Sequence, residues 1–267
     1  MPEPTPLLPT DFTVDQSDPA VPVVTINRAQ KRNAMTLAMW RELGNIFNRL
    51  GAEPDVRAII LTGAGGGFCA GADISEFPAV RATVADGRVY EDAGDHCLSA
   101  IAACPKATIA AVSGPCYGGG VGVALSCDFR VADATATFAI PAARLSNVYG
   151  IVETRAVYEA VGMAYAKEVL FSGRRYEAPE AHRIGLATHF AEGSALDAAK
   201  KLAASLRNSA PLTIKGTKIV LEAISRGDNA ERLAAVHRVK DEAMASADYK
   251  EGVKAFAEKR DPKFRGV

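Results

Sequence analysis

Two apolar segments of this sequence are each followed by a turn built from small residues. Ala58–Leu61 runs into Gly63–Gly67 and then into Phe68–Ile74. Thr108–Val112 leads in the same way to Gly118–Gly120, where a helix is expected to begin. The first N–H groups of a helix have no partner within it. Two such uncovered groups aimed at one point would hold a developing negative oxygen, so the sequence indicates an enzyme that stabilises an oxyanion with main-chain donors.

The hydrophobic periodicity along the chain predicts strands that alternate with helices, which is typical of an α/β fold. Further strands are expected at Val21–Ile26, Phe129–Val131, Thr137–Ile140 and near Leu186–Phe190. Helices are expected at Leu37–Leu50 with Thr36 as its cap, and at Val89–Ala103, Gly119–Leu125, Ala195–Leu206, Pro211–Ile224 and Asn229–Ala247. We therefore divide the chain into a flexible tail (1–10), an α/β core that carries the site (11–194) and a helical C-terminal region (195–267).

Composition excludes several classes of protein. Lys and Arg together number 31 and so do Asp and Glu, and a net charge of zero argues against nucleic acid as a partner. The five cysteines lack CxxC spacing and the four histidines form no ligand-spaced pair, which favours a reducing cytoplasm and no metal site. No apolar run approaches the roughly 20 residues of a membrane span. The proline-rich first residues lack the pattern of a secretory signal.

Common nucleotide and nucleophile motifs are also absent. The glycine-rich turns do not contain GxxxxGK[ST], and neither follows GxGxxG, so phosphate or dinucleotide binding is weakly supported. There is no GxSxG nucleophile elbow.

Four segments together give a specific resemblance. They are Ile26–Met35 (INRAQKRNAM), Gly67–Ile74 (GFCAGADI), Gly114–Gly120 running on to Cys127-Asp128, and Ala255–Phe264. Over residues 12–265 the sequence resembles the crotonase superfamily, the enoyl-CoA hydratase/isomerase family. The resemblance implies a crotonase-like spiral of ββα units with a C-terminal helical trimerisation region, and trimers that usually pair into hexamers.

The resemblance also implies an acyl-CoA thioester substrate, with coenzyme A part of the substrate and no separate cofactor. It places the two oxyanion N–H donors at Ala72 and Gly119. The implied CoA contacts are Arg28, Lys31, Arg32, Ala34, Ala70 and Ile74, with Phe256 and Lys259 closing over CoA, in many members from a neighbouring subunit. The alternative explanation for Arg28, Lys31 and Arg32 is an ordinary solvated basic turn, and for Phe256 it is helix packing.

The sequence differs from the family pattern at the positions of the catalytic glutamates. Hydratases of this family hold a water between two glutamates, and the corresponding positions here are Gly122 and Ala142. Candidate proton carriers are Glu153, Tyr149 and His96, followed by Asp92 and Asp95. Cys69 and Cys116 adjoin the turns and are candidates for a covalent role. Asp73 is expected to have a structural role. We expect an isomerase-type enzyme or a diverged hydratase. A non-catalytic acyl-CoA binder is the alternative, and neutral charge disfavours an RNA-binding role.

Overall fold

The computed structural model describes residues 10–227 and 229–267, so nearly all of the expected N-terminal tail lies outside the described residues. The strands are β1 (Phe12–Asp15), β2 (Val23–Ile26), β3 (Ala58–Gly63), β4 (Ala107–Val112), β5 (Pro115–Tyr117), β6 (Phe129–Asp133), β7 (Thr137–Ala139), β8 (Tyr176–Glu177) and β9 (His189–Ala191). The α-helices are α1 (Leu37–Ala52), α2 (Phe77–Val80), α3 (Val84–Ala102), α4 (Gly119–Ser126), α5 (Ile151–Ser172), α6 (Ala178–Ile184), α7 (Ala195–Leu206), α8 (Pro211–Arg226), α9 (Ala230–Ala245) and α10 (Ala247–Glu258).

The main sheet has the order β1-β2-β3-β4-β6-β9, and a second sheet has the order β5-β7-β8. In the main sheet β1 pairs antiparallel with β2, and the other neighbours are parallel. The carboxyl ends of parallel strands meet at one edge, so the turns that follow β3 and β4 are brought to the same place. This confirms the predicted α/β class.

The core lies on both faces of this sheet because alternate residues of its strands point to opposite sides. On β3, Ile59 and Leu61 join the apolar cluster of α1 and α3, whereas Ala58 and Ile60 join the cluster of α7. On α7 the sheet-facing positions are the small, fully buried residues Ala195, Ala199 and Ala203. The expected boundary at residue 194 precedes this helix, but its packing places α7 with the sheet.

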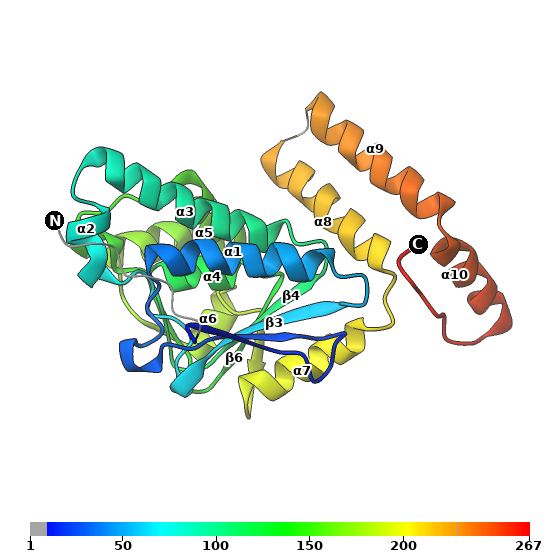
Figure 1. Cartoon of the computed structure of the whole chain (residues 1–267), viewed down its shortest axis with the longest axis horizontal. Helices are drawn as coiled ribbons and strands as arrows, with labels where there is room; N and C mark the ends of the chain where they lie inside the picture. Colours follow the sequence, from blue (N-terminus) through cyan, green and yellow to red (C-terminus); the bar gives the residue numbers. More distant parts are fainter. Residues whose placement is uncertain (1–9, 228) are drawn as a thin grey trace.

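The helices α8, α9 and α10 project from the sheet-containing body as an arm, coloured yellow to red in Figure 1. Lys218 on α8 anchors the arm to the body through an ion pair of 2.9 Å with Asp128. A second anchor is the Arg57 guanidinium, which donates to the Phe264 carbonyl oxygen at 3.0 Å. Large apolar side chains remain exposed on the arm, among them Leu221, Ile224, Met244, Val253 and Phe256.

Element boundaries follow the capping residues. The single helix expected at Asn229–Ala247 is wrong at its end, because Ser246 ends α9 and its side chain accepts from the Tyr249 N–H to cap α10. The helix expected from Val89 begins at Val84, since Thr83 and Asp86 form a capping box. The short strands β1, β5 and β8 are not predicted from the sequence. In the described part of the chain, no helix has the length and apolar character needed to cross a bilayer.

Candidate active site

The two glycine-rich turns are held against each other by main-chain hydrogen bonds. The Cys69 N–H donates to the Pro115 carbonyl at 3.1 Å, and the Tyr117 N–H donates to the Cys69 carbonyl at 2.8 Å. Gly71 has φ +89°, and a Cβ there would lie 2.7 Å from the Tyr117 oxygen and 3.0 Å from the Gly119 nitrogen. Both the backbone conformation and the close approach therefore require glycine at position 71.

The N–H groups of Ala72 and Gly119 are left uncovered by this arrangement. Met35 donates to the Gly71 carbonyl at 2.7 Å and accepts from the Asp73 N–H at 2.8 Å, in a parallel bridge with Ala72. In such a bridge the N–H of the central residue points away from its partner. Gly119 is the first residue of α4, so its N–H has no acceptor within the helix. Among residues 10–227 and 229–267, neither N–H has a hydrogen-bond acceptor, and both residues line one cavity.

This cavity has a volume of about 620 Å³, within the usual range for a small-molecule site. Its wall carries Trp40, Phe77, Tyr90 and Leu98. The Trp40 indole N–H donates to the Tyr90 hydroxyl at 2.8 Å, and the Phe77 and Tyr90 rings meet edge-on with centroids 5.7 Å apart. The sequence does not reveal this wall, since Trp40 has the helical spacing of an ordinary core residue. The cavity combines a fixed apolar surface with two free main-chain donors.

Glu153, in the first turn of α5, is a carboxylate in the same cavity. Its Oε2 accepts from the Gly150 N–H at 3.1 Å. A Cβ on Gly122 would lie 3.9 Å from Glu153 Cγ, so the Glu153 side chain runs beside that position on α4. Burial raises the pKa of Glu153; the Gly150 hydrogen bond opposes this rise, and the nearby Asp95 carboxylate adds to it. A carboxylate with a raised pKa is a stronger base than an ordinary carboxylate, which suits it to remove a proton.

Helix α3 brings Asp95, rather than His96, towards Glu153. A Cβ on Gly150 would lie 3.9 Å from both Asp95 carboxylate oxygens and 3.6 Å from Glu153 Oε2. Burial and the charge of Asp92 raise the pKa of Asp95. His96 is exposed, its ring faces α1 at Gly44, and it is not among the residues that line the cavity. Asp92 is exposed and also lies outside the cavity wall.

Tyr149 precedes α5 and lines the cavity on the side of the glycine-rich turns. Its hydroxyl oxygen lies 3.5 Å from the position of a Cβ on Gly118. Burial raises the pKa of Tyr149 and the Glu153 carboxylate raises it further, so the hydroxyl keeps its proton. Besides Glu91, which pairs with Arg81 at 3.1 Å, the cavity is thus lined by the Glu153 carboxyl and by the Tyr149 phenol, which remains a donor.

In the basic turn, Arg28 has a structural role, whereas Lys31 and Arg32 are available to bind a ligand. Arg28 is buried, pairs with Asp73 at 2.7 Å and donates to the Ala34 carbonyl at 3.0 Å. Burial tends to raise the pKa of Asp73, but hydrogen bonds from Ser75 and Arg28 outweigh it and hold the pKa below its usual value. The Arg28 charge is thus already used within the fold, and the structural role expected for Asp73 agrees with this pair.

Lys31 and Arg32 are exposed and have no ion-pair partner within the described part of the chain. The Arg32 carbonyl accepts from the Ala70 N–H at 3.0 Å, which ties the basic turn to the cavity rim. Ala70 and Ile74 both line the cavity, and Ile74 is 60% exposed at its mouth. These residues form a continuous surface from the cavity to two free cationic side chains.

The cysteines beside the turns are inert in this setting. All five are buried and unpaired. Burial raises the pKa of Cys69 to about 12, and the Cys116 thiol donates to the Gly120 carbonyl at 3.3 Å. A thiol that stays protonated is a poor nucleophile. In the described ranges no group of three or more His, Cys, Asp or Glu is arranged to hold a metal ion.

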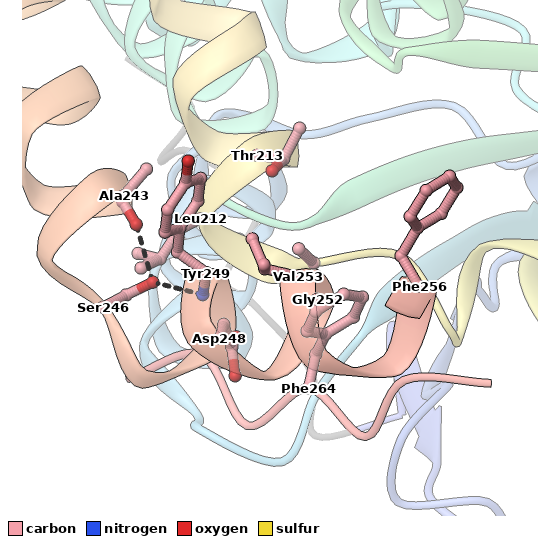
Figure 2. A pocket seen from close by; sticks show the side chains of 11 residues that line it. Leu212, Thr213, Ala243, Ser246, Asp248, Tyr249, Gly252, Val253, Phe256 and Phe264 are labelled. Carbon is pink, nitrogen blue, oxygen red and sulfur yellow. Dashed lines mark hydrogen bonds between the residues drawn. The ribbon is translucent and has the colours of Figure 1, made fainter. Parts of the chain in front are cut away.

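Phe256 and Lys259 lie on the arm, away from this cavity. Phe256 is 88% exposed and lines a second cavity of about 400 Å³ between α8, α9 and α10, shown in Figure 2. The far side of this cavity is closed by the C-terminal segment, which Asp248 holds by accepting from the Arg265 and Gly266 N–H groups, each at 2.7 Å. Lys259 follows α10 and is also exposed. One chain therefore does not bring its own arm over the turns.

The comparisons with known proteins agree over nearly the whole chain. The family model described as enoyl-CoA hydratase/isomerase matches residues 16–267. A short-chain-enoyl-CoA hydratase of Clostridium acetobutylicum is 36% identical over 245 residues, which covers 90% of this chain and 92% of that protein. An (E)-benzylidenesuccinyl-CoA hydratase of Thauera aromatica is 33% identical over 249 residues, with 92% and 96% covered.

Among solved structures, an enoyl-CoA hydratase from Bacillus anthracis superposes with a TM-score of 0.87 at 29% identity, over 96% of this chain and all of that one. The expected crotonase fold is thereby confirmed, including its C-terminal helical region. The chain belongs to the enoyl-CoA hydratase/isomerase family of the crotonase superfamily.

Proposed function

We propose that this acyl-CoA enzyme moves a carbon–carbon double bond of an enoyl-CoA, with the Ala72 and Gly119 N–H groups as an oxyanion hole and Glu153 as its single acid and base. The ionised carboxyl of Glu153 removes a proton from C2 of a 3-enoyl-CoA. The electron pair moves into a dienolate whose negative charge rests on the thioester oxygen. Glu153 then delivers a proton to C4, either the one it removed or one exchanged with solvent, which leaves the double bond between C2 and C3 and consumes nothing.

The placement of Glu153 beside Gly122, in the cavity that both N–H donors line, is the observation that carries this proposal. Double-bond migration needs one group that takes and returns a proton, and a single carboxyl can do both. Preorganised donors at the oxygen would supply most of the rate enhancement, because charge develops there only in the transition state.

Diverged hydration is the second candidate function. It is favoured by the hydratases among the relatives and by the Asp95 carboxylate near Glu153. Against it, neither Gly122 nor Ala142 offers a carboxylate for the water that the family's hydratases place between two glutamates.

For the CoA part of the substrate we propose contacts from Ala70, Ile74, Lys31 and Arg32, with the Arg28 side chain confined to its ion pair. The exposed apolar residues of the arm support a homotrimer, or a hexamer of two trimers, in which Phe256 and Lys259 of one copy cover the site of another. Light scattering coupled to size-exclusion chromatography tests the assembly, and a monomer at micromolar concentration would contradict it. We also propose that the enzyme needs no cofactor other than the CoA of its substrate, and that it is located in the cytoplasm.

A panel of thioesters tests the reaction. Purified protein is incubated with 3-hexenoyl-CoA and 2-hexenoyl-CoA, and products are separated by chromatography and identified by mass. The proposal expects 2-hexenoyl-CoA from the first substrate, and little 3-hydroxyhexanoyl-CoA from either. Dominant water addition would support the diverged hydratase instead. Binding without turnover of any thioester would support the non-catalytic binder, and failure to bind CoA esters would overturn the site.

A further inference from the structure

The hydroxyl of the partly buried Tyr149 is a donor that the fold itself does not use. Within residues 10–227 and 229–267 it makes no hydrogen bond, although Tyr149 lines the cavity and packs against the main apolar core. Tyrosine hydroxyls in the interior of a protein usually have a hydrogen-bond partner. The other cavity tyrosine, Tyr90, follows this rule, because its hydroxyl accepts from the Trp40 indole at 2.8 Å. An open donor that faces a substrate cavity is therefore available to the substrate.

Positions along helix α4 indicate which end of the substrate the Tyr149 hydroxyl faces. The Tyr149 hydroxyl lies 3.5 Å from the Cβ position of Gly118, immediately before the Gly119 N–H. The same Cβ position lies 4.0 Å from Gly71 Cα, at the contact between the two turns. Glu153 instead approaches Gly122, about 4.5 Å further along the helix axis at 1.5 Å per residue. Tyr149 is thus at the thioester end, and Glu153 is further along the acyl chain.

The chemistry of the phenol limits its role. Burial and the neighbouring Glu153 carboxylate favour the protonated form of Tyr149, so it cannot serve as a base at neutral pH. A neutral phenol beside two main-chain N–H groups has the properties of a third hydrogen-bond donor to an oxyanion.

We propose that Tyr149 is a catalytic residue whose hydroxyl donates a hydrogen bond to the enolate oxygen of the bound thioester, as a third donor beside the Ala72 and Gly119 N–H groups. This rests on the proposed acyl-CoA chemistry. It assigns Tyr149 to charge stabilisation and leaves proton exchange with carbon to Glu153.

The test is Tyr149→Phe, with Tyr158→Phe as a matched control because Tyr158 is half exposed on the outer surface of α5. We expect kcat for 3-hexenoyl-CoA to fall on the order of 10²-fold in Tyr149→Phe, the lower end of the effect of losing one oxyanion-hole donor, with KM nearly unchanged. The control should match the wild type.

A second readout measures polarisation directly and does not require turnover. Cinnamoyl-CoA has a conjugated thioester, and hydrogen bonds to its carbonyl oxygen shift its absorption to longer wavelength. We expect a red shift on binding to wild type and to Tyr158→Phe, and a smaller shift with Tyr149→Phe.

An unchanged shift in Tyr149→Phe would overturn the proposal, as would turnover within twofold of the wild type. An unchanged shift with abolished proton exchange at C2 would make Tyr149 an acid instead. If the wild type shifts the absorption but turns over no enoyl-CoA, the proposed reaction fails while the third donor stands. If no thioester binds, both fail.

Discussion

Gly71→Ala should separate the two turns without removing either proposed donor. The added Cβ would lie 2.7 Å from the Tyr117 oxygen and 3.0 Å from the Gly119 nitrogen, where ordinary contacts begin at 3.4 Å. The carbonyl would have to retreat by about 0.7 Å and the Gly119 N–H by about 0.4 Å. Misplacement of a catalytic group by about 1 Å can cost 10²-fold in rate. We therefore expect kcat to fall on the order of 10²-fold.

Gly66→Ala is the matched control, because it carries the same backbone strain without the collision. Gly66 has φ +76° and a Cβ there meets no atom within 4 Å, whereas Gly71 has φ +89°. An alanine at positive φ costs roughly 1–2 kcal/mol, so Gly66→Ala should lose about that much free energy of unfolding, and Gly71→Ala should lose more because of its collision. Urea unfolding and steady-state kinetics measure the two effects separately. Equal kcat in Gly71→Ala and Gly66→Ala would refute the argument that the contact between the turns builds the site.

Three further predictions concern charged groups. Asp95→Asn should move the acidic limb of the kcat/KM profile to lower pH, because it removes a carboxylate that raises the pKa of Glu153; an unmoved limb would contradict this. Glu153→Gln should abolish most activity yet raise the free energy of unfolding at pH 8. The folded pKa of Glu153 lies above its unfolded value, so its ionisation costs stability as pH rises from about 4.5, and the gain should disappear towards pH 4. Equal free energies of unfolding for the wild type and Glu153→Gln at pH 8 would contradict this prediction. Arg28→Met should cost about 3–5 kcal/mol in urea unfolding, since it leaves Asp73 buried and unpaired; a small loss with a large rise in KM would instead make Arg28 a CoA ligand.

Local sequence signals predicted the fold where they matched the tertiary packing. Thr36 caps α1 as expected, and Ala195–Leu206 forms a helix with the predicted bounds. The strands β5 and β8, of three and two residues, were missed because such short pieces carry no measurable periodicity and form only through tertiary pairing. The predicted end at Ala247 lies two residues beyond the observed end of α9 at Ala245, and α10, which Ser246 caps, was not predicted.

The candidate site was predictable where it depends on local sequence signals and not where it depends on tertiary packing. The turns after two apolar strands indicated main-chain donors, the family resemblance placed these donors at Ala72 and Gly119, and the cavity brings both residues together. Arg28 shows the limit: an exposed-looking cation in the sequence is buried against Asp73, a pairing between distant segments. Asp95 and His96 are neighbours on α3 that point in different directions, and which of them faces the cavity depends on how that helix is rotated, which a single sequence does not specify.

The roles of the oxyanion hole and of Glu153 meet in one measurement, which is the proton NMR spectrum of 3-hexenoyl-CoA in D₂O with wild type and with Glu153→Gln. The account predicts that the wild type moves the double bond to C2 and introduces deuterium at C2 or C4, without forming 3-hydroxyhexanoyl-CoA. Glu153→Gln should slow both processes on the order of 10²-fold or more, the range for loss of a general acid–base group. Deuterium incorporation and double-bond migration at wild-type rates in Glu153→Gln would contradict the account.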